Sequence, residues 1–388
     1  MPLSDPATMT VPNPQSGDSP EARRYNRIKR WLGMTDAVIG FLLLVALLVT
    51  GWTARLRDWS YHLGGQHYFF AVFLYVLMFS LIMKALSAPL DFYGYRTERR
   101  YDLSNQKLGA WLWDELKGWL LGLVMGAIVV ELIYAIIRIA PQRWWIIAWA
   151  VFVGLFLLLA QLAPVILLPL FYKFEPLNND ELRDRLTRLG QRAGTRVRGV
   201  YEWKLSEKSK KANAALTGLG GTRRIILADT LLQNYSDDEI EAVLAHELGH
   251  HVRRHILKGI LMQVTITLFG FWLTNQVLRF ALARDWFPSL DPRMYDFANL
   301  PLIFLVATVL GFLLIPAMNA LSRQHEREAD LYAWENIPAI GPFVTAMTKL
   351  ADQNLAERTP SRFVEWFFES HPSIQKRIAA AEAWARSR

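Results

Sequence analysis

Long apolar runs separated by polar stretches dominate the hydrophobic pattern of this chain. A helix needs roughly 20 mostly apolar residues to cross the hydrocarbon core of a bilayer, and six segments meet that requirement. The fourth run contains Pro164 and Pro169 near its end, which predicts a kink or a break there because proline removes a helical hydrogen bond. The pattern therefore predicts a polytopic membrane protein. The predicted spans are approximately residues 35–53, 68–88, 118–139, 144–172, 257–281 and 300–321.

A polar stretch of mixed pattern lies between the fourth and fifth runs. Residues 179–193 place apolar positions at helical spacing and end before a glycine, which predicts a short amphipathic helix. Short runs at residues 200–205, 212–217 and 224–228 predict β-strands. No Lys-Ser or Lys-Thr pair follows the glycines of residues 218–221, so they predict a hairpin turn and not a phosphate-binding loop.

A further helix is expected after the third strand. Ser236 and Glu239 form a capping box, which is a sequence signature of a helix N-terminus. Ile240, Val243 and Leu244 then repeat at helical spacing. The helix is expected to continue through the next residues, which read His-Glu-Leu-Gly-His.

The two histidines of that run, His246 and His250, lie four residues apart and so on one helical face, where they can bind one metal ion together. With Glu247 they form the H-E-x-x-H signature of zinc peptidases. Zinc lowers the pKa of water toward neutrality, and the glutamate takes the proton as the water attacks a peptide carbonyl. Arg253 and Ile256 occupy the Gly and His positions of the extended motif, which excludes the class whose third ligand is a nearby histidine.

A third ligand must therefore come from elsewhere in the chain. Glu326 and Asp330 lie four residues apart on a later predicted helix, so Glu326 can bind zinc while Asp330 holds the other nitrogen of a ligand histidine. His325 and Glu328 remain rival ligands. Two predicted spans separate His250 from Glu326, and an even number of crossings returns the chain to the same side of the membrane. The sequence thus predicts one zinc ion per chain, with Glu247 as general base.

Composition and charge agree with a membrane location. The chain has 388 residues, 52% of them hydrophobic, and a mean hydropathy of +0.15. Its net charge of +8 comes largely from basic residues before the first span and between the second and third spans. The positive-inside rule therefore places both termini and residues 173–256 in the cytoplasm, at the inner membrane if the host is a bacterium.

Two absences narrow the possible chemistry. The sequence contains no cysteine, which excludes disulfides, a thiolate metal site and a cysteine nucleophile. It contains no module that combines aromatic and basic residues in the manner of nucleic-acid-binding proteins, so no nucleic-acid partner is expected.

Glu131 lies within the third predicted span, where it is expected to face the bundle interior or a water-filled cavity. Its role is open between a structural polar contact and a part of a substrate path.

Three further segments match motifs of one peptidase family. Residues 322–330 carry the pattern Ser-Arg-x-x-Glu-x-x-Ala-Asp, residues 213–218 read Asn-Ala-Ala-Leu-Thr-Gly, and residues 371–377 read His-Pro-Ser-Ile-Gln-Lys-Arg. With the zinc helix and the following His255, they resemble the membrane zinc metallopeptidases that include CAAX prenyl protease 1 and the bacterial heat-shock protease HtpX. The resemblance covers roughly residues 90–377. It is closest to the CAAX prenyl protease 1 branch.

The resemblance implies roles for further residues. It implies that Asn213 contacts the substrate backbone and that His371 and Arg377 face the active site. The residues themselves agree, because Asn213 opens a short strand that can pair with an extended peptide. Pro372 in the first turn of a helix would place His371 at the N-cap, where it can donate a hydrogen bond to the tetrahedral oxyanion while Arg377 adds positive charge.

The branch assignment rests on the segments before the third span. Residues 90–93 and 105–109 resemble the prenyl protease branch, whereas HtpX is shorter and has no such segment. The chain departs from the eukaryotic pattern in three ways: it has one predicted N-terminal span fewer, it has no endoplasmic-reticulum retention signal, and Ser373 replaces the second proline of the His-Pro motif.

The expected fold is mainly α: a polytopic membrane helix bundle of about six spans with a small α+β zincin-type catalytic domain on the cytoplasmic side. The resemblance adds a conical bundle that encloses a large chamber. The expected segments are a disordered tail (1–22), a bundle of four spans (23–172), a catalytic insert with the H-E-x-x-H helix (173–256), two further spans (257–321) and a helical segment with the third ligand and the His-Pro motif (322–388).

The expected function is that of an integral-membrane zinc metalloendopeptidase that resembles CAAX prenyl protease 1. One alternative is an HtpX-like protease for quality control of membrane proteins. The other is a non-catalytic membrane scaffold or chaperone with structural zinc, which the glutamate between the histidines disfavours. The expected partners are a peptide or protein substrate, with lipidated and membrane-associated forms included, and the lipid bilayer.

Overall fold

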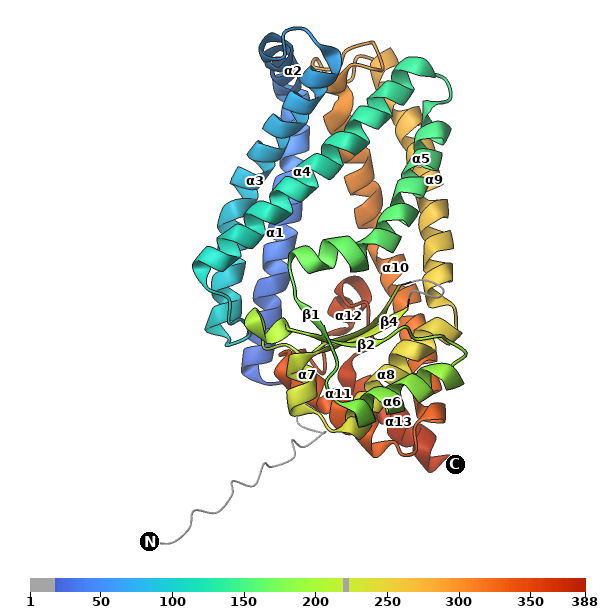
Figure 1. The fold of residues 1–388 in the computed structure, drawn as a ribbon. Helices are drawn as coiled ribbons and strands as arrows, with labels where there is room; N and C mark the ends of the chain where they lie inside the picture. The colour runs from blue at the N-terminus through green and yellow to red at the C-terminus, as the bar shows by residue number, and fades with distance from the viewer. Residues whose placement is uncertain (1–17, 219–222) are drawn as a thin grey trace.

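The structure, a computed structural model, describes residues 18–218 and 223–388. Long helices run along one axis, and a small sheet with several short helices gathers at one end, where the C-terminus also lies (Figure 1). Six helices in the described ranges are long and apolar enough to cross a membrane, which confirms the predicted spans. They are α1 (Pro20–Thr50), α3 (Tyr68–Arg100), α4 (Leu108–Ile139), α5 (Trp144–Leu162), α9 (His255–Ala283) and α10 (Leu300–Asn336).

Several of these helices extend beyond their apolar runs. α1 begins at Pro20, where the side chain of Ser19 accepts a hydrogen bond from the backbone N–H of Ala22 at 3.0 Å. Serine followed by proline is a strong helix start, so residues 20–22 are helical and not part of a disordered tail. Residues 1–17 of that predicted tail lie outside the described residues.

The fourth span is broken where the prolines predicted it. α5 ends at Leu162, a π turn follows at Ala163–Leu167, and a short 3₁₀ turn follows at Leu168–Leu170. Proline cannot donate the helical hydrogen bond, so Pro164 and Pro169 change the hydrogen-bonding pattern at these two turns. The chain thereby bends away from the bundle and enters the sheet.

The sheet has four strands in the order β1-β2-β4-β3. β2 and β4 are parallel, and the other neighbours are antiparallel. The three predicted strands are present, and the additional strand β1 has three residues and ends in a proline, too short to give a sequence signal. The predicted turn at residues 218–221 lies outside the described residues apart from Gly218. The strands are β1 (Phe174–Pro176), β2 (Val200–Trp203), β3 (Ala214–Thr217) and β4 (Arg224–Ala228).

Short helices surround the sheet at this end of the molecule. Asn179 caps α6 through a hydrogen bond from the backbone N–H of Leu182 at 3.0 Å, which confirms the predicted amphipathic helix. The capping box of Ser236 and Glu239 is present at the start of α8. The short helices are α6 (Asp180–Arg192), α7 (Asp229–Asn234), α8 (Asp237–Val252), α11 (Gly341–Gln353), α12 (Arg362–Phe368) and α13 (Ile374–Arg386).

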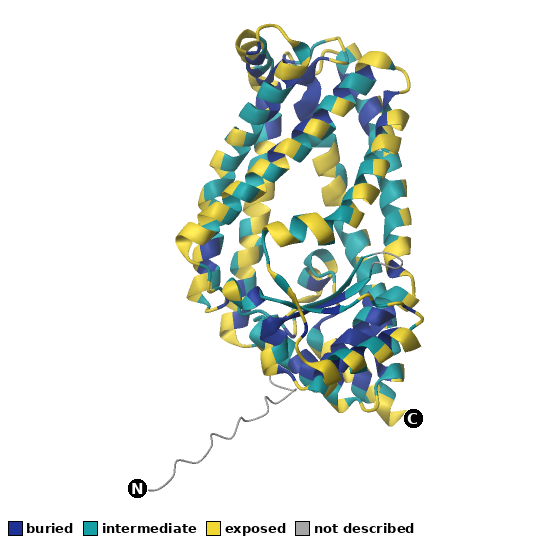
Figure 2. Cartoon of the chain, viewed as in Figure 1, coloured by how far each residue is buried: buried dark blue, intermediate teal, exposed yellow. Residues whose placement is uncertain are grey.

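Two distant parts of the chain share one hydrophobic core here. Leu227 and Leu244 come from the insert between the spans, whereas Phe343 and Ile378 come from the C-terminal segment, and all four belong to the same buried cluster. Figure 2 shows the buried residues concentrated around α8 and the sheet, while the middle of the long helices carries many exposed positions. Large apolar side chains such as Leu313 are exposed on those helices, a pattern that a lipid environment stabilises.

The opposite end of the bundle is closed by α2 (Trp52–Leu63) and by the loop between α9 and α10. Arg57 of α2 forms ion pairs with Asp291 at 3.2 Å and Asp296 at 3.1 Å. Tyr75 and Phe297 are buried beside them in a second apolar cluster. The long helices are therefore held together at both ends by separate cores.

Candidate active site

Helices α8 and α10 approach each other very closely at Gly249. A Cβ atom placed on this glycine would lie 2.8 Å from both the Cα and the carbonyl oxygen of Ala329. No larger residue fits between the two backbones without moving one helix. Because α10 is a single helix that continues past its apolar run, this contact brings the segment around Glu326 against the H-E-x-x-H face of α8.

The three expected ligands meet at this crossing. The Nε2 atoms of His246 and His250 lie 3.2 Å apart, and each lies 3.3 Å from a carboxylate oxygen of Glu326. One ligand atom from each residue lies within 4.8 Å of the other two, which is compatible with one shared metal ion. The even number of crossings inferred from the sequence is thus consistent with the fold.

The chemistry of this donor set fits zinc. Two imidazole nitrogens and one carboxylate are the ligands of many catalytic zinc sites, and they leave a fourth position open. Glu326 is buried, and among the described residues its Oε2 has no hydrogen-bond partner. A buried carboxylate oxygen in that state is costly unless a cation neutralises it, and a metal ion would add to the positive charge of Arg377, whose Nη1 lies 3.9 Å away. The rival ligands His325 and Glu328 do not belong to this cluster.

Asp330 lies behind His246, as the spacing of the later helix predicted. Its Oδ1 is 2.8 Å from the Nδ1 of His246, which leaves the Nε2 directed at the other ligands. The buried Arg377 of α13 donates to both oxygens of Asp330, at 2.6 Å and 2.8 Å. Such a bidentate pair fixes the carboxylate, and through it the orientation of the imidazole.

A second support behind His250 was missed by the sequence reasoning. The Nδ1 of His255 lies 3.1 Å from the Nδ1 of His250, and the Nε2 of His255 lies 2.9 Å from Glu328. His325 stacks on His255 with ring centroids 4.1 Å apart. Each expected ligand histidine is therefore linked through its Nδ1 to a carboxylate: His246 directly to Asp330, and His250 through His255 to Glu328.

His371 reaches the site from outside any helix. α13 begins at Ile374 with Ser373 as its N-cap, so the prediction that Pro372 lies in the first turn is wrong. Serine is a preferred N-cap residue, and its carbonyl here accepts the first N–H of the helix ladder. The Nε2 of His371 nevertheless lies 3.3 Å from a carboxylate oxygen of Glu326, and its side chain is 59% exposed.

Glu247 lies beside the two ligand histidines on α8 and is half buried. Burial raises the pKa of its carboxyl above the ordinary range, and the positive potential of His246 and His250 opposes that shift. A carboxylate with a raised pKa is a stronger base than one in free solution. The position and the environment both suit proton transfer.

Asn213 lies immediately before β3, which is an edge strand of the sheet. Its backbone carbonyl accepts a hydrogen bond from Ala228 at 3.0 Å, and its side chain is exposed. β3 contacts α8, so the edge of the sheet lies next to the helix of the metal ligands. An edge strand of this kind offers unpaired backbone groups to an extended peptide.

Glu131 lies in α4, away from these residues. Its Oε2 is buried and has no hydrogen-bond partner within residues 18–218 and 223–388. The two roles expected for Glu131, a structural polar contact and a part of a substrate path, both stay predictions.

Substitution of Gly249 tests the helix crossing. The methyl group of Gly249→Ala would meet two backbone atoms of Ala329, so α8 and α10 must separate and Glu326 must move away from His246 and His250. We expect the variant to lose about 1–3 kcal/mol of stability and to bind metal more weakly. The control is Gly259→Ala, whose added methyl group meets nothing within 4 Å. Equal melting temperatures and metal contents in the two variants would contradict the crossing described here.

Substitution of His255 tests the support behind His250. His255→Phe keeps a ring that can stack on His325 but removes both nitrogens that contact His250 and Glu328. We expect zinc affinity to fall about 10- to 100-fold, as is typical when a residue that orients a ligand is removed. Competition with a fluorescent zinc chelator measures this. Unchanged affinity would show that His250 is oriented without His255.

Two family models match the chain, one over each half. The family model described as peptidase family M48 matches residues 176–385. The family model described as CAAX prenyl protease N-terminal, five membrane helices, matches residues 16–173. Within that second range the structure has four long apolar helices together with the short α2.

Individual proteins are similar over nearly the whole chain. Uncharacterized metalloprotease YhfN of Bacillus subtilis is 32% identical over 381 residues, which cover 98% of this chain and 88% of that protein. CAAX prenyl protease 1 of Saccharomyces cerevisiae is 27% identical, with 79% of this chain and 70% of that protein covered. The crystal structure of S. mikatae Ste24p superposes with a TM-score of 0.81 at 23% identity, over 93% of this chain and 87% of that chain, and so shares the fold. The chain therefore belongs to peptidase family M48, among the multi-span membrane metalloproteases that resemble CAAX prenyl protease 1.

Proposed function

We propose that the protein is a zinc-dependent endopeptidase whose metal is held by His246, His250 and Glu326. The observation that carries the proposal is the cluster of three ligand atoms within 4.8 Å of one another, beside a half-buried glutamate. One zinc ion per chain suits this cluster. Membership of a peptidase family favours an enzyme over the scaffold alternative, in which zinc would be structural.

Zinc, when bound, acts as a Lewis acid that polarises the scissile carbonyl and makes water acidic near neutral pH. Glu247 takes the proton of the attacking water and then delivers it to the leaving amine. Asp330 accepts a hydrogen bond from the Nδ1 of His246 and so holds the tautomer whose Nε2 can bind metal. Deprotonated Nε2 atoms and an ionised Glu326 are the forms that the site needs.

His371 and Arg377 are proposed to stabilise the negative charge that develops on the substrate during the reaction. His371 lies on the open side of the cluster, where its Nε2 can donate to the oxyanion that forms when the carbonyl is attacked. Arg377 is buried and engaged with Asp330, and its Nη1 lies 3.9 Å from Glu326. We propose that Arg377 acts through Asp330 and through its charge, while His371 contacts the substrate.

The substrate is proposed to bind as an added strand along β3. This strand is an edge of the sheet and contacts the helix that carries Glu247. Asn213 at its start has an exposed side-chain amide, which can bond to both the N–H and the C=O of an extended peptide. Main-chain pairing of this kind positions a scissile bond without demanding a particular side chain.

We propose that the natural reaction is the endoproteolytic processing of CAAX-ended, lipidated proteins. The similarity to proteins named CAAX prenyl protease 1 supports this substrate class, and so does a site located at one end of a membrane bundle. The same end carries the C-terminus and the start of α1 (Figure 1). The basic loops at that end support a cytoplasmic active site, a bacterial inner-membrane location if the host is a bacterium, and cytoplasmic termini.

The catalytic domain is proposed to consist of residues 173–256 and 322–388. These segments share a buried cluster, which contains Leu244 from the first and Phe343 from the second. The spans of residues 23–172 and 257–321 would then present the lipidated substrate to this domain.

Purified protein with zinc in detergent tests the substrate class. One CAAX-ended peptide is supplied in farnesylated and bare forms, and products are identified by mass spectrometry. We expect removal of the last three residues, preferentially from the farnesylated peptide and only with Glu247 intact. Equal cleavage of both forms at scattered sites would favour a quality-control protease. No cleavage of either form would favour a zinc protein without this activity.

A further inference from the structure

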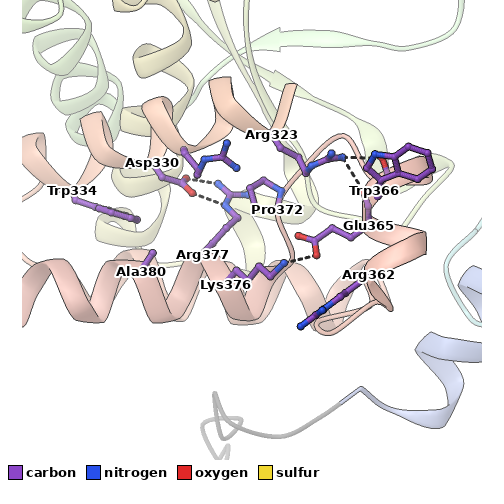
Figure 3. Close-up of a pocket in the computed structure, with 11 residues that line it drawn as sticks. Arg323, Asp330, Trp334, Arg362, Glu365, Trp366, Pro372, Lys376, Arg377 and Ala380 are labelled. Atoms are coloured by element: carbon purple, nitrogen blue, oxygen red, sulfur yellow. Dashed lines mark hydrogen bonds and ion pairs between the residues drawn. The ribbon is translucent and has the colours of Figure 1, made fainter. Parts of the chain in front are cut away.

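A pocket of about 420 Å³ lies between α10, α12 and α13, and Asp330 and Arg377 are among the residues that line it (Figure 3). Its lining contains five basic and two acidic side chains. None of the basic residues other than Arg377 belongs to the proposed catalytic machinery. The excess of positive charge is the feature that needs an explanation.

Both acidic groups of the pocket already have a partner. Asp330 forms the bidentate pair with Arg377, at 2.6 Å and 2.8 Å. Glu365 forms an ion pair with Lys376. These two pairs neutralise two of the five basic side chains, and Figure 3 shows both as dashed contacts at the pocket wall.

Three arginines remain without an acidic partner. Arg323 donates through Nη1 to the backbone carbonyls of Glu365 at 2.8 Å and Glu369 at 2.6 Å, which position the guanidinium but leave its charge uncompensated. Arg327 and Arg362 are exposed and form no hydrogen bond or ion pair with the residues that the structure describes. The pocket therefore gathers three uncompensated positive charges from α10 and α12, which is an arrangement suited to an anion.

The position of the pocket along α10 identifies the kind of anion. The predicted apolar run of this helix ends at Leu321, so Arg323 and Arg327 follow at about 3 Å and 9 Å along the axis. The headgroup region of a bilayer is about 5–8 Å thick on each side, so the backbone of Arg323 lies within it and that of Arg327 lies just outside it, from where a long arginine side chain can reach back. On α12, Trp366 is 51% exposed and Phe363 is 61% exposed, and aromatic side chains favour this interfacial layer.

We propose that this pocket binds the phosphate group of an anionic phospholipid. Arg323, Arg327 and Arg362 bind the phosphate oxygens, and planar guanidinium groups suit such bidentate contacts. The acyl chains lie beside Phe363, Trp366 and the apolar part of α10. This site is independent of the proposed peptidase function, although Asp330 and Arg377 form its inner wall.

Native mass spectrometry of the detergent-solubilised, zinc-loaded protein tests the proposal. The probes are phosphatidylglycerol, phosphatidylcholine, and glycerol 1-phosphate, which carries the phosphate without acyl chains. We expect one tightly retained phosphatidylglycerol per chain and weaker retention of phosphatidylcholine. In the double variant Arg327→Gln/Arg362→Gln the apparent affinity for phosphatidylglycerol should fall about 10- to 30-fold, because each cation near a lipid surface contributes about 1 kcal/mol.

The matched control is Arg143→Gln/Arg284→Gln, which removes two exposed arginines at the opposite end of the spans, outside this pocket. It should retain phosphatidylglycerol like the unmodified protein. Equal loss in the two double variants, equal retention of the two lipids, or no loss in Arg327→Gln/Arg362→Gln would each overturn the proposal. Displacement of phosphatidylglycerol by equimolar glycerol 1-phosphate would assign the pocket to a soluble phosphate and overturn the lipid as its ligand.

Discussion

Glu247→Gln is expected to abolish peptide hydrolysis while the protein keeps its metal. The substitution preserves the size of the side chain and leaves the ligand atoms of His246, His250 and Glu326 in place. It removes only the carboxylate that accepts a proton from water, and a general base of this kind contributes about 10²- to 10⁴-fold to the rate. The loss should therefore appear in kcat, with substrate affinity little changed.

The measurement combines peptide turnover with metal content by inductively coupled plasma mass spectrometry. Glu335→Gln is the matched control, because Glu335 is an exposed carboxylate on the same end of the protein. Turnover by Glu247→Gln at the rate of this control would refute the assignment of the general base. Loss of metal from Glu247→Gln would show that the residue supports the site and does not act in proton transfer alone.

Glu326→Ala is expected to lose zinc. The carboxylate lies 3.3 Å from the Nε2 of each ligand histidine and is the one contribution of α10 to the ligand cluster. Without it, two histidines on one helix remain, and catalytic zinc sites ordinarily require three protein ligands. Zinc content should fall from one ion per chain to near zero after dialysis against a weak chelator, and activity should be lost with it.

Glu328→Ala separates this effect from a general loss of negative charge near the site. Glu328 contacts His255 and not the ligand cluster, so this variant should keep most of its zinc at saturating metal concentration. Full zinc content in Glu326→Ala, together with loss in Glu328→Ala, would make Glu328 the third ligand.

The sequence predicted the parts of the fold that depend on local pattern. Uninterrupted apolar runs identified the six membrane helices, and the prolines identified the break after α5. The capping box predicted the start of α8, and the spacing of His246 and His250 predicted that the two side chains meet on one face of that helix. These predictions depend on neighbours within a few turns of the same helix, where sequence distance and spatial distance agree.

The missed features depend on contacts between distant segments. His255 is the first residue of α9 and Glu328 lies on α10, and the two residues are 73 positions apart in the sequence. They meet because α9 and α10 pack against each other, and the spacing of the residues gives no signal of that contact. The start of α13 was misplaced because proline and serine both favour helix starts, and the choice between Pro372 and Ser373 depends on tertiary contacts. The length of α1 and α10 was underestimated because polar helical turns outside the membrane carry no apolar signal.

The division of the metal site between α8 and α10 has a consequence for biosynthesis. During translation the two histidines of α8 leave the ribosome first, whereas Glu326 follows only after α9 and most of α10 have been made. Arg377, which fixes Asp330, comes last of all, on α13. A nascent chain therefore lacks part of the proposed metal site until α10 and the C-terminal segment have been made. The proposed site can therefore form only after nearly the whole chain has been synthesised.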